Sequence, residues 1–124
     1  MREIFRAKRV DNGEWVEGNF ITGKNNTQTF IGYISAIDNG MVHDIDIAEV
    51  NPETVCQSIG LIDKNGVRIF EGDIVVLNDE DERFIIEWDP NAARFILKGK
   101  TFVTDFDSYW GYQTEIIGNA FDNT

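Results

Sequence analysis

Signals for chain reversal follow one another so closely in this sequence that only short strands fit between them. Residues 60–75 carry two, Asp63-Lys64-Asn65-Gly66 and Glu71-Gly72-Asp73. Asn and Gly accept positive φ at little steric cost, so the first signal is typical of a tight hairpin. The second separates Ile69-Phe70 from a β-branched run that begins at Ile74. The segment therefore predicts strand, hairpin, strand, corner and strand, as in a small curled sheet or barrel.

The same pattern continues on both sides of this segment. Asn-Gly recurs at residues 12–13 and 39–40, each time between apolar runs. The sequence Asn51-Pro52-Glu53-Thr54 predicts one helical turn, with Asn as the cap and Pro at the first helical position. Further strands are expected over residues 4–10, 15–21, 30–37, 41–47, 84–88, 94–98, 101–104 and 114–117. In residues 41–47 the apolar odd positions and His43 alternate with Asp44 and Asp46, which predicts a strand with one wet face.

These signals indicate a mainly β protein, α+β at most, built from short antiparallel strands. A length of 124 residues suits one domain, residues 1–124. We expect a soft subdivision into an N-terminal β segment, residues 1–55, and a part resembling a small SH3-like barrel, residues 56–124, with the first packed on the second. A single cysteine, no long apolar run and a charged N-terminus predict a cytoplasmic protein without a membrane span.

The charge balance restricts the class of partner. Eleven Lys and Arg against 22 Asp and Glu give a net charge of −11. Direct nucleic-acid binding is disfavoured, because binding phosphates needs a basic footprint. The acidity is explained either by solubility, which is the commoner case, or by a surface that meets a basic protein partner.

The sequence supplies no set of residues for catalysis, for a cofactor or for a metal ion. His43 is the only histidine and Cys56 the only cysteine, too few for a usual zinc site. We expect His43 to be a half-buried structural residue. Neighbouring carboxylates match no EF-hand loop, and the glycines form no phosphate-binding pattern. An enzyme is therefore a distant alternative.

One cluster deserves a functional interpretation beside a structural one. Three large rings, Tyr109, Trp110 and Tyr112, follow the point at which the strand pattern stops. They either form a loop folded over the core or anchor a protein contact, since Tyr and Trp are common interface residues. With acidic loop residues nearby, the candidate protein-binding set is Asp79, Asp81, Asp105, Asp107, Tyr109, Trp110 and Tyr112.

The chain resembles the YopX-like family of phage and prophage proteins. The central signature comprises Gly60-Leu61, Asp63-Lys64-Asn65-Gly66 and Ile69-Phe70-Glu71-Gly72-Asp73-Ile74-Val75. Residues 1–8, 15–18, 50–57 and 115–119 resemble further family segments in the same order, although Lys8 and Arg9 stand where an aromatic residue commonly follows Ala7. The resemblance implies a single YopX-like domain in the host cytoplasm, and it implies no established activity.

Two functional hypotheses follow from these observations. The first is a non-catalytic protein-binding module, with homo-oligomer formation left open. The second is an acidic inhibitor that imitates nucleic acid at a DNA-binding protein. Salt dependence separates them, because a mimic loses affinity steeply as salt rises and an apolar contact does not.

Overall fold

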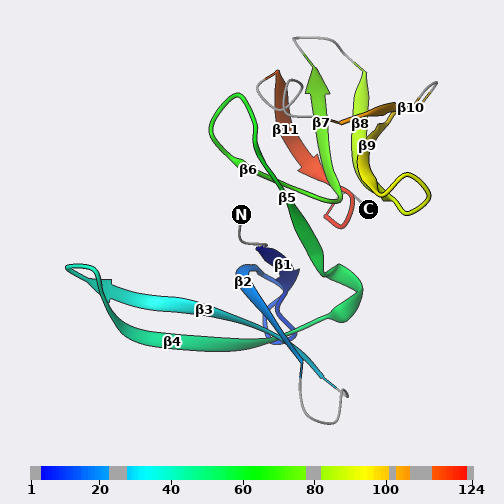
Figure 1. Ribbon diagram of the computed structural model, residues 1–124. Helices are drawn as coiled ribbons and strands as arrows, with labels where there is room; N and C mark the ends of the chain where they lie inside the picture. Colours follow the sequence, from blue (N-terminus) through cyan, green and yellow to red (C-terminus); the bar gives the residue numbers. More distant parts are fainter. Residues whose placement is uncertain (1–3, 23–27, 78–81, 101–102, 107–112, 123–124) are drawn as a thin grey trace. The chain divides into compact units, whose positions relative to one another are not determined.

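The computed structural model describes residues 4–22, 28–77, 82–100, 103–106 and 113–122. These residues form antiparallel strands and one short 3-10 helix, which confirms the mainly β fold (Figure 1). The chain divides into two compact units, an N-terminal unit of residues 2–57 and a C-terminal unit that begins at Ser58. Each unit is described by itself.

The N-terminal unit is a sheet with strand order β4-β3-β2-β1. Its strands are β1 (Phe5–Lys8), β2 (Trp15–Thr22), β3 (Thr29–Asp38) and β4 (Met41–Val50). The predicted reversals are present, since Gly13 and Gly40 have φ of 73° and 79°. The predicted helical turn is also confirmed as η1 (Pro52–Thr54), where the Asn51 side chain accepts a hydrogen bond from the Glu53 N–H at 3.0 Å. Local turn chemistry therefore determines where this half of the chain changes direction.

The core of the N-terminal unit is small and lies on one face of the sheet. Ala7, Ile31 and Val50 are buried there. Gly18 on β2 is needed for close packing, because a Cβ at this position would strike the carbonyl oxygen of Gly32 on β3. The face that carries Ile31 is called the inner face below.

The C-terminal unit contains a second antiparallel sheet, with order β10-β9-β8-β7-β11. Its strands are β7 (Asp73–Leu77), β8 (Arg83–Asp89), β9 (Arg94–Lys98), β10 (Val103–Asp105) and β11 (Thr114–Asn119). Before them come β5 (Cys56–Ile62) and β6 (Arg68–Phe70), which pair as the predicted hairpin. In the described residues neither sheet closes on itself, so a closed SH3-like barrel is not confirmed.

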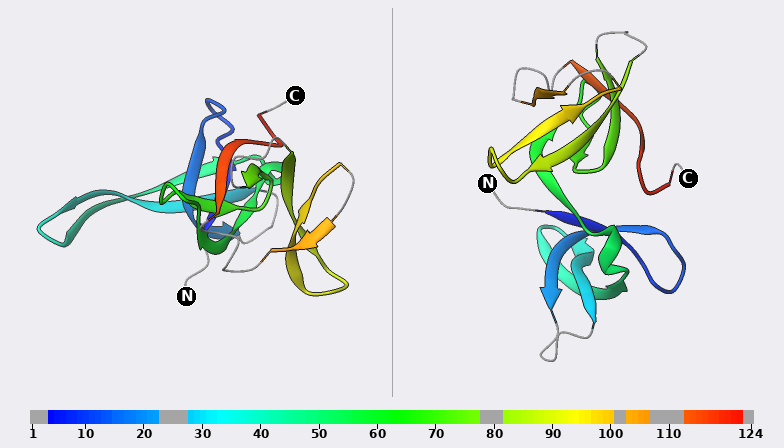
Figure 2. Two further views of the ribbon diagram at one scale, coloured as in Figure 1. Left: turned by 90° about the horizontal axis from the view of Figure 1, so that it is seen from above. Right: turned by 90° about the vertical axis from the view of Figure 1, so that its right-hand side faces the viewer.

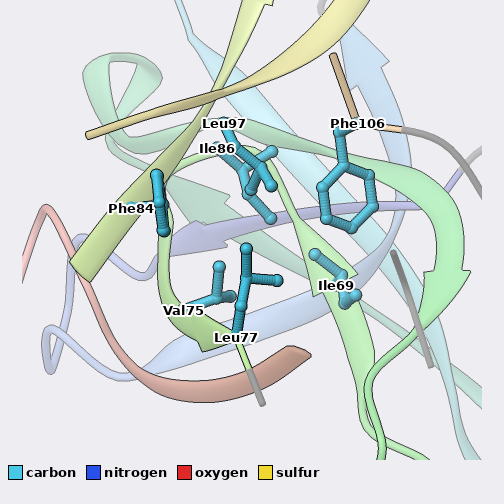
Figure 3. Close-up of a cluster of buried hydrophobic side chains, with 7 residues drawn as sticks. All are labelled: Ile69, Val75, Leu77, Phe84, Ile86, Leu97 and Phe106. Carbon is cyan, nitrogen blue, oxygen red and sulfur yellow. The ribbon is translucent and has the colours of Figure 1, made fainter. Parts of the chain in front are cut away.

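Among the described residues, most of the buried apolar side chains of this unit form one cluster. Figure 3 shows seven of them pointing toward a common interior: Ile69, Val75, Leu77, Phe84, Ile86, Leu97 and Phe106. The corner at Gly72 helps to hold the strands around this interior. Gly72 has φ of 87°, its N–H donates to the Ile86 carbonyl at 2.8 Å, and its carbonyl accepts from the Ala120 N–H at 2.8 Å.

The prediction for residues 41–47 is wrong in one respect. A strand forms there, but every residue from Ile34 to Ile47 is exposed, so both faces of the β3–β4 ribbon are wet. His43 is likewise exposed rather than half-buried, with 55% of its side chain accessible and its Nε2 3.9 Å from Asp38 Oδ2. Figures 1 and 2 show the reason, because β3 and β4 continue as a two-stranded ribbon past Gly32, where the pairing of β3 with β2 stops.

Candidate protein-binding surface

Only one residue of the predicted binding set can be placed. Asp105 lies on β10, is exposed, and its Oδ1 is 3.0 Å from the Arg94 Nε. Its charge is therefore matched within the C-terminal unit. The other six predicted residues, Asp79, Asp81, Asp107, Tyr109, Trp110 and Tyr112, lie outside the described residues.

A different surface stands out in the N-terminal unit, on the side of the sheet opposite its core. In antiparallel pairs, directly opposed residues share a face, and residues two apart on a strand share a face as well. Gly32 of β3 is opposite Asn19 on one side and Ile47 on the other, and Ile34 is opposite Ile45. We define the outer face as those residues connected in this way that lie nearest Gly32: Asn19, Ile21, Phe30, Gly32, Ile34, Ile45, Ile47 and Glu49.

Apolar side chains dominate the outer face and are open to solvent. Ile34, Ile45 and Ile47 are 53%, 63% and 61% exposed, and Ile21 is exposed as well. The side chain of Ile21 covers Gly32, where an added Cβ would lie 2.7 Å from the Ile21 Cδ1. The centre of the outer face is therefore a continuous apolar strip across three strands.

Charged groups border this strip, since Glu17 lies two positions from Asn19 on β2 and is opposite Arg6 on β1. Glu49 is the one ionisable residue of the outer face as defined, and the Gln28 Nε2 donates to its Oε1 at 3.4 Å. Asp46 belongs to the inner face, since it is opposite Tyr33 and one position from both Ile45 and Ile47. The arrangement offers a partner apolar contact without a counter-charge at its centre.

A hollow of about 440 Å³ lies elsewhere in the N-terminal unit, where β1 and β4 end. Arg9 lines it, but the guanidinium is already engaged. Its Nε and Nη2 each donate to an Asp11 carboxylate oxygen at 2.9 Å, and its Nη1 donates to the Tyr33 hydroxyl at 3.3 Å. These bonds raise the pKa of Arg9 and lower that of Asp11. The cation is therefore matched locally and is a poor receptor for an external anion.

The two buried carboxylates near the central hairpin serve the fold. Asp63 Oδ1 accepts from the N–H groups of Asn65 and Val67, both at 2.9 Å, and its Oδ2 accepts from the Ile116 N–H at 3.1 Å. Asp73 Oδ2 accepts from the Phe70 N–H at 2.8 Å, across the corner at Gly72. Their acceptor capacity is directed at the backbone, so these acids hold turns in place.

Sulfur and metal chemistry have little support among the described residues. Cys56 is buried, and its Sγ lies 3.3 Å from the Thr54 carbonyl oxygen. In the described ranges no group of three His, Cys, Asp or Glu side chains is placed to hold a metal ion. No helix among these residues has the length and apolar character needed to span a membrane.

Sequence reasoning missed the outer face, although a signal for it was present. Residues 30–37 contain Phe30, Ile31, Ile34 and Ile37, so apolar residues occupy odd and even positions alike. A strand with two apolar faces has to be covered on both sides or has to bind something. The alternation in residues 41–47 indicates only which residues share a face, and it does not indicate whether that face is covered.

Comparison with known proteins identifies the family to which the chain belongs. No curated protein matches the chain. A family model described as YopX protein matches residues 4–124, which includes both units and the central signature with Asp63, Gly72 and Asp73. The chain therefore belongs to the YopX protein family.

Proposed function

We propose that this protein is a non-catalytic protein-binding module that acts through the outer face of β2, β3 and β4. The observation that carries the proposal is the exposure of Ile34, Ile45 and Ile47 on one uncharged strip. Single exposed apolar residues are ordinary, but a contiguous apolar strip marks a site of interaction.

Burial of these three side chains by a partner would be energetically favourable. Full burial of an Ile side chain stabilises by about 1.5–3 kcal/mol relative to exposure. Three such side chains, each more than half exposed, represent several kcal/mol that a docked partner would gain. Ordering costs reduce this gain on binding, and they are modest where the backbone is already a paired strand.

The non-catalytic part of the proposal has its own support. A general acid or base needs a titratable group directed at a substrate. Asp63 and Asp73 are directed at backbone N–H groups, and His43 stands exposed on the ribbon with Asp38 as its neighbour. The nucleic-acid mimic keeps the overall charge as its support, and Asp105 adds nothing to it because that charge is paired with Arg94.

A photo-crosslinking experiment tests whether the outer face touches protein. Benzoylphenylalanine is placed at Ile45 in one variant and at Val67, an exposed apolar residue of the C-terminal unit, in the control. Irradiation of living cells that express each variant should give a discrete protein adduct from position 45 and little from position 67. Equal or absent adducts at the two positions would contradict the proposed function.

A further inference from the structure

We propose that Asn39 is a site of spontaneous covalent modification, at which the turn Asn39-Gly40 deamidates through a cyclic imide while the protein stays folded. The inference is independent of the outer face and its partner, since it concerns only the turn that joins β3 to β4. It rests on a comparison of three exposed turns that share the same two residues, Asn followed by Gly, at residues 12–13, 39–40 and 65–66.

The reaction needs an asparagine side chain and the backbone nitrogen of the next residue. That nitrogen gives up its proton to hydroxide and attacks the asparagine Cγ, and the side-chain nitrogen takes up a proton and departs as ammonia. Water then opens the five-membered imide at either of its two carbonyls, which leaves aspartate or isoaspartate in place of asparagine. Glycine favours ring closure because no Cβ crowds the attacking nitrogen. Each of the three pairs is therefore chemically competent, and the fold decides between them.

Two of the three turns hold the attacking nitrogen in a hydrogen bond. The Gly13 N–H donates to the Arg9 carbonyl at 3.0 Å, and the Gly66 N–H donates to the Asp63 carbonyl at 3.0 Å. In the first of these turns the asparagine Oδ1 also accepts a backbone hydrogen bond at 2.9 Å, which fixes the group that would be attacked. A hydrogen-bonded N–H gives up its proton only when the turn opens. Both turns are thus protected by their own hydrogen bonds.

The turn at residues 39–40 lacks this protection. Asn39 has φ of 50° and Gly40 has φ of 79°, as in the mirror-image turn of a two-residue hairpin. The flanking residues Asp38 and Met41 form the last pair of the ladder. In the part of the chain that the structure describes, the Gly40 N–H has no acceptor and the Asn39 side chain has no hydrogen-bond partner. The attacking nitrogen and the attacked side chain are therefore both open to solvent.

The place of this turn in the fold also lets its backbone rearrange. Ring closure brings the Gly40 nitrogen onto the Asn39 Cγ, so the turn has to leave its hairpin geometry. Every residue from Ile34 to Ile47 is exposed, and a two-stranded ribbon is marginally stable in water at best. Opening of the ribbon end therefore costs less free energy than opening of the turn at residues 65–66, which the buried Asp63 carboxylate holds through two backbone N–H groups.

The modification would change the ribbon in two ways. Either product adds a negative charge next to Asp38, whose Oδ2 lies 3.9 Å from the His43 Nε2. Isoaspartate also directs the main chain through the former side chain, which lengthens the two-residue turn by one carbon atom. Because the turn sets the register of a hairpin, this product disturbs the pairing of Asp38 with Met41.

Peptide mass spectrometry of the full chain tests the inference. Folded protein is held in a warm, mildly alkaline buffer, and samples are digested at acidic pH, which suppresses further reaction. Replacement of the side-chain NH₂ by OH is followed at each of the three asparagines, and fragmentation distinguishes isoaspartate from aspartate. We expect Asn39 to convert at least about tenfold faster than Asn12 and Asn65, because its turn opens at the lowest cost.

Two controls separate the fold from the sequence. In urea the three pairs lose their turns, so their rates should become similar. Asn39→Asp, which already carries one product and keeps a residue that tolerates positive φ, should lose most of the mass gain that the folded wild type shows. The inference is overturned if Asn39 falls short of the tenfold ratio in the folded protein, if that ratio persists in urea, or if Asn39→Asp gains mass as fast as wild type.

Discussion

The two units of this protein differ in how many of their apolar residues are buried and how many are exposed. Among the described residues, the C-terminal unit places nine apolar residues in its interior, and the N-terminal unit places five. Large apolar residues left exposed show the reverse, with nine in the N-terminal unit and five in the C-terminal unit. The C-terminal unit buries more of its large apolar residues in its own core, whereas the N-terminal unit leaves more of them exposed. The half with the recognisable signature is thus distinct from the half with the candidate binding surface.

The strongest test of this contrast removes the carboxylate of Asp63. Asp63→Ala leaves three backbone N–H groups of the C-terminal unit without their acceptor, and we expect a loss of about 3 kcal/mol or more in the free energy of unfolding. Amide hydrogen exchange should show the loss in residues 58–124. Asp63→Asn, which keeps one acceptor oxygen, should lose less. Equal protection in wild type and Asp63→Ala would contradict the structural role of this acid.

Gly18→Ala tests the N-terminal unit in the same way. The added Cβ would strike the Gly32 carbonyl oxygen on the neighbouring strand, and relief of this contact requires the backbone to move. We expect a loss of about 2 kcal/mol, within the range for overpacking. Hydrogen exchange should locate the effect in residues 2–57, the reverse of the Asp63 result. Gly118→Ala is the control, because nothing lies within 4 Å of its added Cβ.

Gly72→Val tests whether the corner in the central signature requires the backbone conformation of glycine. With φ of 87° and hydrogen bonds on both its N–H and its carbonyl, Gly72 is fixed in a conformation that a β-branched residue adopts only with strain. Thermal or denaturant unfolding should show a loss of more than about 1 kcal/mol. A midpoint that matches wild type within error would show that the corner relaxes freely.

The smallest effects are expected at the two residues that sequence inspection singles out for chemistry. His43→Gln lies on an exposed ribbon and should change stability by no more than about 0.5 kcal/mol. Cys56→Ser should cost about 1 kcal/mol, since Ser can bond to the same Thr54 carbonyl but is more polar in a buried site. Crosslinking from position 45 should survive both changes. Its loss from either variant in folded form would give that residue a functional role.

Local features of the structure could be predicted from the sequence, because they depend on neighbouring residues. The turns at Gly13, Gly40 and Gly66 follow from Asn-Gly pairs, and the single helical turn follows from Asn51-Pro52. The link from Asp63 to Ile116 joins residues 53 positions apart, and no pattern of neighbours indicates it.

The candidate site was harder to predict for a related reason. Alternation shows that Ile45 and Ile47 share a face, but what covers that face depends on strands elsewhere in the chain. His43 was predicted to be half-buried for the same reason, because alternation does not indicate that its part of the ribbon is exposed. The aromatic residues 109–112 remain a prediction outside the described residues.

The long-range tie at Asp63 also has a consequence for protein synthesis. The sheet of the C-terminal unit includes β11, so it is incomplete until residues 114–119 have left the ribosome. The N-terminal unit ends at Gln57, so its strands leave the ribosome well before β11 does. The outer face is therefore presented while much of the chain is still being translated.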